Sequence, residues 1–219
     1  MAKRITIFAG HYGSGKTNIA VNFALAQRRK GFPVAVADLD IVNPYFRTKD
    51  SEKLFAEEGI RLISSAYSNT NVDIPALPQE MYAVIDDLSS TFVLDIGGDD
   101  RGALALGRLA PGILKENNFE MYLVANFFRP LTRDSGALME VMREMEIAGG
   151  IPFTGVINNS NLGEETTAKD VLSSVPLAME FSRFSGLPLV MTCANETLKP
   201  ELEGKISDLM FLKLQDKYY

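Results

Sequence analysis

A glycine-rich run near the start of the chain constrains its fold more than any other feature. Residues 10–17 read GHYGSGKT, which matches the pattern G-x-x-x-x-G-K-[ST]. The run follows the apolar segment 5–9 and precedes a segment with helical periodicity that starts at Asn18. A strand, a glycine loop and a helix in this order place successive backbone N–H groups and a helix N-terminus around phosphate oxygens. The sequence therefore predicts binding of a nucleoside triphosphate.

The residues of this loop have separate expected tasks. Lys16 would reach the β- and γ-phosphates, and the hydroxyl of Thr17 would ligate Mg²⁺. The residues expected to contact the nucleotide are the loop itself and the first residues of the helix: Gly10, His11, Tyr12, Gly13, Ser14, Gly15, Lys16, Thr17 and Asn18.

The rest of the chain alternates short apolar runs with helical patterns, which is typical of βαβ units and a parallel sheet. Strands are predicted at 4–9, 33–38, 91–96, 119–125 and 153–158, with weaker ones near 60–64 and 175–178. Helices are predicted at 16–30, 50–58, 77–89, 102–115, 133–148 and 198–217, and 65–78 is the most loop-like segment. Most strands are apolar on both faces. We therefore expect one α/β domain over residues 1–219, with helices on both faces of a mostly parallel, twisted sheet.

Composition excludes several classes of protein. At 219 residues and 46% hydrophobic, the chain is long enough for one substantial domain, whereas two would be cramped. A single cysteine excludes an intrachain disulfide and a Cys-x-x-Cys metal site. The net charge of −6 argues against broad nucleic-acid binding. No signal peptide and no apolar run of about 18 residues is present. We expect a cytoplasmic protein that makes no stable membrane insertion.

Acidic residues end two of the predicted strands. Asp38 ends strand 33–38, Asp40 lies two residues further on, and Asp95 ends an apolar run. Ligands in such folds bind beyond the carboxyl ends of the strands. Asp95 has the layout of a carboxylate that holds Mg²⁺, and Asp38 or Asp40 would orient a water or assist the metal. Gly98 follows closely enough for its backbone N–H to approach a γ-phosphate, so residues 96–103 are a candidate nucleotide-sensing switch.

Taken together, the glycine loop, the Asp-Leu-Asp of 38–40 and the Asp-Ile-Gly-Gly of 95–98 resemble the MinD/ParA/Mrp group of P-loop ATPases. This group carries the CobQ/CobB/MinD/ParA nucleotide-binding domain. The resemblance implies ATP and Mg²⁺ as ligands, slow hydrolysis, an ATP-dependent homodimer and a protein partner that is not identified.

The resemblance also implies residue roles. Asp38 would be a metal-shell or switch acid, Asp40 the water-positioning carboxylate and Asp95 the Walker B acid. Asn158 resembles an asparagine that helps to read adenine, and Pro188 falls where a base-flanking loop lies. No Asn-Lys-x-Asp guanine motif is present.

One position departs from the family pattern. The family loop begins with a lysine that reaches the partner's phosphates, and His11 stands in its place. Arg47, Arg101 and Arg129 each follow a predicted strand end, where a guanidinium would supply the missing charge.

Two other functions remain open from the sequence. The first is ATP-dependent transfer to a small molecule, as in synthetases that resemble CobB and dethiobiotin synthetase, or in kinases. The second is a module that binds ATP without hydrolysing it. The tail 209–217 has apolar spacing, which we interpret as a last helix packed on the sheet.

Overall fold

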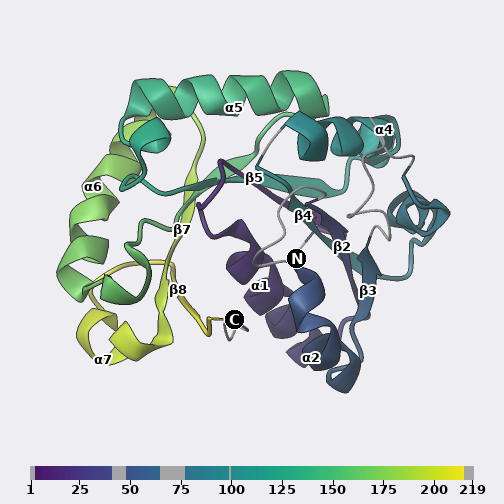
Figure 1. Ribbon diagram of the computed structural model, residues 1–219, viewed down its shortest axis with the longest axis horizontal. Coiled ribbons are helices and arrows are strands. Elements are labelled where there is room, and N and C mark those ends of the chain that lie inside the picture. Colours follow the sequence, from purple (N-terminus) through teal and green to yellow (C-terminus); the bar gives the residue numbers. More distant parts are fainter. Residues whose placement is uncertain (1–2, 41–47, 65–76, 99, 215–219) are drawn as a thin grey trace.

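The computed structural model describes residues 3–40, 48–64, 77–98 and 100–214. Its centre is one eight-stranded sheet in the order β3-β2-β4-β1-β5-β6-β7-β8, and every neighbouring pair is parallel (Figure 1). The strands are β1 (Ile5–Ala9), β2 (Val34–Leu39), β3 (Arg61–Ser64), β4 (Thr91–Ile96), β5 (Phe119–Ala125), β6 (Gly155–Asn158), β7 (Leu189–Asn195) and β8 (Leu209–Leu212). The expected α/β class with a parallel sheet is confirmed.

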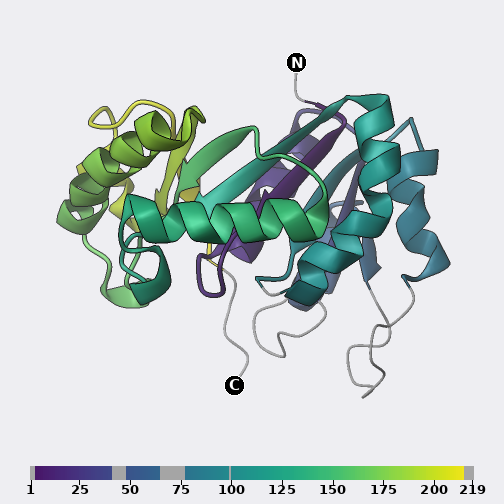
Figure 2. The same cartoon turned by 90° about the horizontal axis from the view of Figure 1, so that it is seen from above.

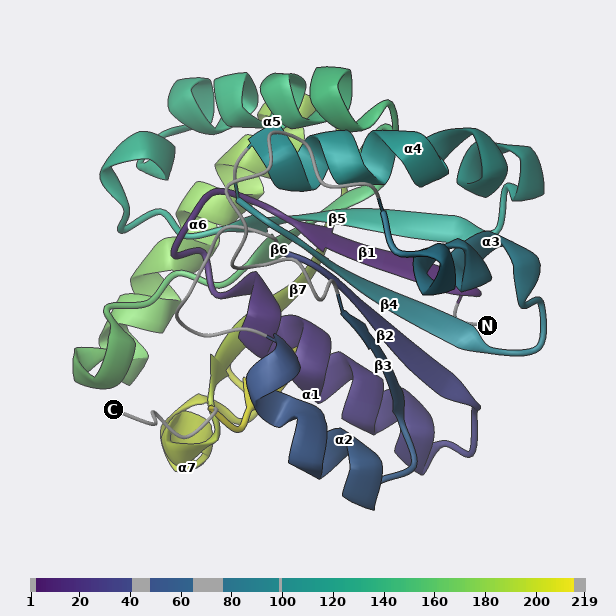
Figure 3. The same cartoon turned by 45° about the vertical axis from the view of Figure 1, so that its right-hand side comes forward.

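Helices cover both faces of the sheet. The α-helices are α1 (Lys16–Arg29), α2 (Glu52–Glu57), α3 (Ala83–Asp86), α4 (Asp100–Glu116), α5 (Ser135–Gly149), α6 (Ala168–Ser185) and α7 (Lys199–Leu202). Short 3₁₀ turns include η1 (Thr48–Ser51), η2 (Gln79–Tyr82) and η3 (Pro130–Thr132). In Figure 3, α4 and α5 lie on one side of the central strands, and α1 and α2 lie on the other. Figure 2 shows α5 extended across its face of the sheet.

The alternation of side chains along the strands creates two apolar cores. On β4, Phe92 and Leu94 belong to the core under α4 and α5, whereas Val93 belongs to the core under α1. All three side chains are fully buried. Strands that bury both faces in this way read as continuous apolar runs, and this explains why the sequence located β4 and β5 to the residue.

Two sequence predictions about the last third of the chain are wrong. The weak strand at 175–178 is part of α6, a helix that the sequence analysis missed because Pro176 lies inside it. Thr167 and Asp170 form a capping box at its start, and Gly186 ends it with φ 76°. The expected helix at 198–217 is instead the short α7 followed by β8. Asp208, with φ 53°, precedes that strand, which pairs with β7.

Other boundaries differ by less. The helix expected at 77–89 is the 3₁₀ turn η2 followed by one turn of α3. The segment 65–76 of the expected loop lies outside the described residues, as does Arg47. None of the helices in the described ranges has the length and apolar character needed to span a bilayer.

A buried arginine, Arg4, connects several elements at the edge of the sheet where β1 begins. Arg4 is 9% exposed, and its guanidinium donates to the carboxylate of Glu116 at the end of α4. It also donates to the carbonyl oxygens of Val84 and Asp87 at 2.8 and 2.9 Å, and it lies over the ring of Phe92. Arg4 therefore links the start of β1 to α3 and α4.

We predict that Arg4→Met lowers the free energy of unfolding by about 3 kcal/mol, because it leaves a half-buried carboxylate and two carbonyl groups without their donor. Urea denaturation followed by far-UV circular dichroism measures this. Arg133→Met is the matched control, since the Arg133 side chain is 75% exposed and its ion pair is with Asp134, which is also exposed. Its effect should stay within about 0.5 kcal/mol. Equal effects of the two substitutions would contradict the structural role of Arg4.

Candidate functional site

The glycine loop joins β1 to α1 at the carboxyl edge of the sheet. Its turn closes where the N–H of Ser14 donates to the carbonyl of His11 at 3.1 Å. Gly15 has φ 83°, and a Cβ there would collide with the amide nitrogen of Asn159. A residue with a side chain is therefore excluded at Gly15 by both strain and space.

Asn159 fixes the loop from the neighbouring strands. Its Nδ2 donates to the carbonyl of Ser14 at 2.7 Å, and its own backbone N–H donates to the carbonyl of Ala125 at 2.8 Å. The residue is 5% exposed. A buried amide thus connects the ends of β5 and β6 to the loop, and this contact was not anticipated from the sequence, where Asn159 is one of several polar residues after a strand.

Lys16 and Thr17 begin α1 directly above a buried carboxylate. Both are nearly buried, and Asp95 at the end of β4 is fully buried. Oδ2 of Asp95 accepts a hydrogen bond from Thr48 Oγ1 at 2.8 Å, whereas Oδ1 has no hydrogen-bond partner among the described residues. Asp40 lies near enough to act on this carboxylate electrostatically.

Burial raises the pKa of Asp95 above its usual value, and the negative charge of Asp40 adds to this effect. The ammonium of Lys16 and the hydroxyls of Thr17 and Thr48 oppose it. A buried carboxylate oxygen without a donor, beside a hydroxyl, is a donor set that suits a hard cation such as Mg²⁺. The residues present therefore fit a magnesium ion.

Asp38 and Asp40 lie beside this carboxylate, as the sequence indicated. Asp38 is in register with Asp95 on the adjacent strand, so both side chains project toward the α1 face. Oδ1 of Asp38 accepts the backbone N–H of Asp40 at 3.0 Å, and both residues are almost fully buried. The structure thus brings all three predicted acids to one edge of the sheet.

The turn after β4 lies against the glycine loop. A Cβ on Gly98 would come within 2.5 Å of the backbone nitrogen of Tyr12. This close backbone approach explains the glycine, and it puts the candidate switch segment in contact with the phosphate-binding loop. Arg101 lies in the first turn of α4.

A cavity of about 910 Å³ opens beside the loop, a volume suited to a nucleotide. Seven of the residues expected to bind nucleotide line this cavity: His11, Tyr12, Gly13, Gly15, Lys16, Thr17 and Asn18. Its other polar and apolar walls come from later segments: Arg129, Pro130, Leu131, Asn159, Ser160, Asn161, Gly163, Glu164, Thr166, Val171, Cys193, Ala194, Asn195, Leu212 and Leu214. Most of these come from the ends of β6, β7 and β8, and the sequence analysis missed the last two strands.

Two residues expected near the base lie elsewhere. Asn158 is fully buried, with its Nδ2 donating to Ser174 Oγ and its Oδ1 accepting from Ser160. The structure does not place it on the cavity wall, which is lined instead by Asn159 and Asn161. Pro188 precedes β7 and lies at the opposite edge of the sheet, where its carbonyl accepts the N–H of Val156. Its expected place beside the base is wrong.

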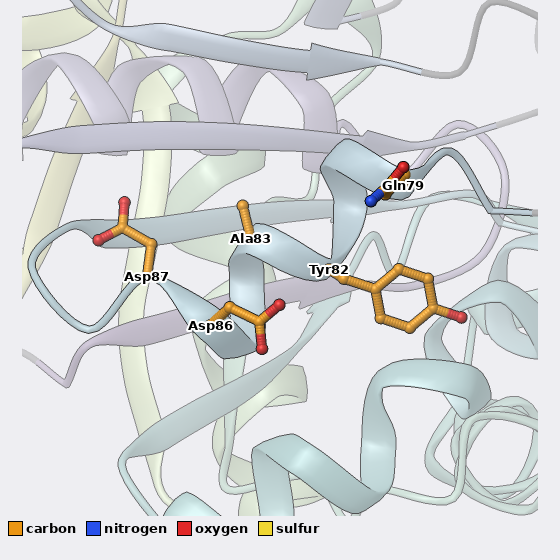
Figure 4. A pocket seen from close by; sticks show the side chains of 5 residues that line it. All are labelled: Gln79, Tyr82, Ala83, Asp86 and Asp87. Atoms are coloured by element: carbon orange, nitrogen blue, oxygen red, sulfur yellow. The ribbon is translucent and has the colours of Figure 1, made fainter.

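A second hollow, of about 600 Å³, lies over η2 and α3 (Figure 4). Gln79, Tyr82, Ala83, Asp86 and Asp87 line it, and these described residues include no cation. The carboxylate of Asp87 accepts hydrogen bonds from Ser89 and Ser90, which lower its pKa to about 2. An acidic hollow repels phosphate, so the cavity beside the glycine loop is the candidate nucleotide site.

Comparison with known proteins agrees with this assignment. The family model of the CobQ/CobB/MinD/ParA nucleotide binding domain matches residues 5–171. The chain belongs to this family. It is therefore a P-loop nucleotide-binding protein, and the resemblance drawn from the three short motifs is confirmed. No curated protein matches the sequence.

Solved structures with a similar fold include FtsY proteins and the 54 kDa protein of the signal recognition particle. Cell division protein FtsY from Thermotoga maritima is 16% identical, with a TM-score of 0.62 over 88% of this chain and 62% of that one. The receptor FtsY from Elizabethkingia anophelis, in complex with GDP, is 13% identical, with a TM-score of 0.59 over 99% and 61%. The 54 kDa protein from Aeropyrum pernix, also with GDP, is 16% identical, with a TM-score of 0.54 over 90% and 43%. The chain spans about three fifths of the FtsY chains, and the likeness shows the fold.

We predict that Asn159→Ala weakens nucleotide affinity about tenfold, because the loop loses the buried donor that holds the Ser14 carbonyl. Isothermal titration calorimetry with a nucleoside diphosphate measures this. Asn118→Ala is the control, since Asn118 accepts the N–H of Arg4 at the far edge of the sheet. Unchanged affinity in Asn159→Ala would show that the loop keeps its shape without this amide.

Proposed function

We propose that this protein binds ATP together with Mg²⁺, hydrolyses it slowly, and uses the change of nucleotide to control a protein partner or a second copy of itself. The observation that carries the proposal is the buried Oδ1 of Asp95, which has no hydrogen-bond partner among the described residues. It lies beneath the start of α1, where Lys16 and Thr17 are held. Such an atom is costly to bury unless a ligand completes it.

Each residue has a role in this proposal. The N–H groups of residues 10–17 surround the phosphates, and Lys16 neutralises the β- and γ-phosphates. Thr17 and Asp95 would hold Mg²⁺, directly or through its waters, with Asp38 beside them. A bound Mg²⁺ supplies charge neutralisation at the phosphate oxygens. Asp40 would position the attacking water and accept a proton from it.

The choice of ATP over GTP rests on the resemblance to the MinD/ParA/Mrp group, and the amides of the cavity wall support it. Guanine is bound through a carboxylate that accepts its N1 and N2 hydrogens, and Glu164 is the one carboxylate among the described lining residues. Amides such as Asn161 and Asn195 also line that end, together with the hydroxyl residues Ser160 and Thr166. Amides match the mixed donor and acceptor edge of adenine. FtsY and the 54 kDa protein above were solved with GDP, so nucleotide selectivity is a direct test.

The switch is proposed to work through the turn at Gly98. This turn touches the glycine loop and leads into α4, which begins at Asp100. A γ-phosphate that accepts a hydrogen bond from the backbone of this turn would order residues 96–103, and its loss on hydrolysis would release them. Control of a partner through α4 follows from that change.

We predict that Lys16→Ala reduces ATP affinity by at least about 100-fold and removes measurable hydrolysis, because the buried ammonium is lost from the phosphate site. Isothermal titration calorimetry with ATP and with GTP measures the affinities, and the release of inorganic phosphate measures hydrolysis. Lys199→Ala is the control, since Lys199 is exposed and pairs with Glu203. Full turnover in Lys16→Ala would overturn the proposed function, and tighter binding of GTP than of ATP would overturn the choice of base.

We predict that the mass of the protein in solution doubles with Mg²⁺ and a non-hydrolysable ATP analogue, but not with Mg²⁺ and ADP. Light scattering coupled to size-exclusion chromatography measures this. An unchanged mass with both nucleotides would contradict a dimer formed face to face. It would favour transfer of phosphate to a small acceptor, which is then tested by the stimulation of ATP turnover by added acceptors.

A further inference from the structure

Arg129 lies over the glycine loop in the candidate site. A Cβ built on Gly13 would lie 3.5 Å from its Nε and 3.7 Å from its Cζ, so the guanidinium lies next to the middle of the loop. The residue also lines the 910 Å³ cavity, together with Lys16. Arg129 comes from the segment after β5 and approaches the loop from the side opposite Asp95 on β4, since β5 and β4 flank β1.

The backbone that carries Arg129 is built around a buried amide. Asn126 is fully buried, and its Oδ1 accepts the N–H groups of Phe128 and Asn161. Its carbonyl accepts the N–H of Arg129 at 3.2 Å and the hydroxyl of Thr132. The N–H of Thr132 in turn donates to the carbonyl of Arg129. The backbone on both sides of Arg129 is therefore fixed in turns, and its exposed side chain starts from a rigid position beside the loop.

The guanidinium of Arg129 is not neutralised by an ion pair with any of the described residues. By contrast, Arg133, four residues later, pairs with Asp134. His11 has its Nδ1 at 3.0 Å from the carbonyl oxygen of Tyr12, so that ring nitrogen is directed to the loop's own backbone. A guanidinium beside a loop of N–H groups, with no carboxylate partner among the described residues, is a site for phosphate oxygens.

We propose that Arg129 contacts the outer phosphates of the nucleotide bound to its own chain, as a second cation beside Lys16. The inference rests on the proposed function. It makes Arg129 a catalytic residue of hydrolysis that acts within one chain. Positive charge at this position favours the triphosphate over the diphosphate and stabilises the charge that spreads over the transferred phosphoryl oxygens.

The test compares Arg129→Ala with Arg133→Ala; both arginines are exposed, but Arg133 does not line the cavity. We expect Arg129→Ala to reduce the rate of phosphate release about 10- to 100-fold. Its affinity for a non-hydrolysable ATP analogue should fall about tenfold more than its affinity for ADP. Arg129→Lys should recover part of the rate, because it keeps the charge but not the two-pronged geometry. Arg133→Ala should match the wild type.

Two results would overturn the inference. Wild-type turnover in Arg129→Ala, with turnover lost in Lys16→Ala, would show that Arg129 has no phosphate contact while the proposed function stands. If Lys16→Ala also keeps wild-type turnover, the proposed function itself fails. Mixing Arg129→Ala with Lys16→Ala tests the action within one chain. No recovery of turnover is expected, and recovery would show that Arg129 acts on the nucleotide of a neighbouring copy.

Discussion

The parallel pairing of β2 with β4 is the constraint on which the site depends. It sets Asp38 opposite Asp95, and the period of two along each strand points both carboxylates to the face where α1 begins. The start of α1 is fixed in turn by the pairing of β1 with β4 and β5. Because all of these strands run in one direction, their carboxyl ends, the glycine loop and the acids meet at a single edge.

The loop itself is held by close backbone approaches from both neighbours of β1. A Cβ on Gly10 would lie 2.5 Å from the carbonyl of Val124 on β5, and one on Gly98 would lie equally close to Tyr12. Asn159 adds a hydrogen bond to Ser14. A phosphate-binding loop restrained in this way is largely shaped before the ligand arrives, which reduces the ordering cost of binding. Because Gly98 lies this close to Tyr12, a movement of the backbone at Gly98 would also displace the glycine loop.

The parts of the molecule that the sequence predicted are those with strong local patterns. The glycine loop and the acids at the ends of β2 and β4 are marked by residues that their chemistry requires. The last third of the chain lacks such marks, since Pro176 lies inside α6 and the apolar run 209–212 suits a helix as well as a strand. Residues 209–212 form a strand because they pair with β7, and this tertiary contact is not visible in the local sequence. The far wall of the cavity was missed for this reason.

The charges of the site explain why nucleotide and metal should bind together. Asp38, Asp40 and Asp95 place three carboxylates at one edge, and Lys16 and Arg129 are two cations on the cavity side. A polyphosphate brought alone to this edge would add negative charge to an acidic surface. The pKa of Asp95 is raised mainly by burial, and the negative charge of Asp40 adds a smaller effect in the same direction. A divalent cation bound with the phosphates offsets the repulsion between phosphates and carboxylates and stabilises the charged form of Asp95, so the acids favour a metal–nucleotide complex over the free nucleotide.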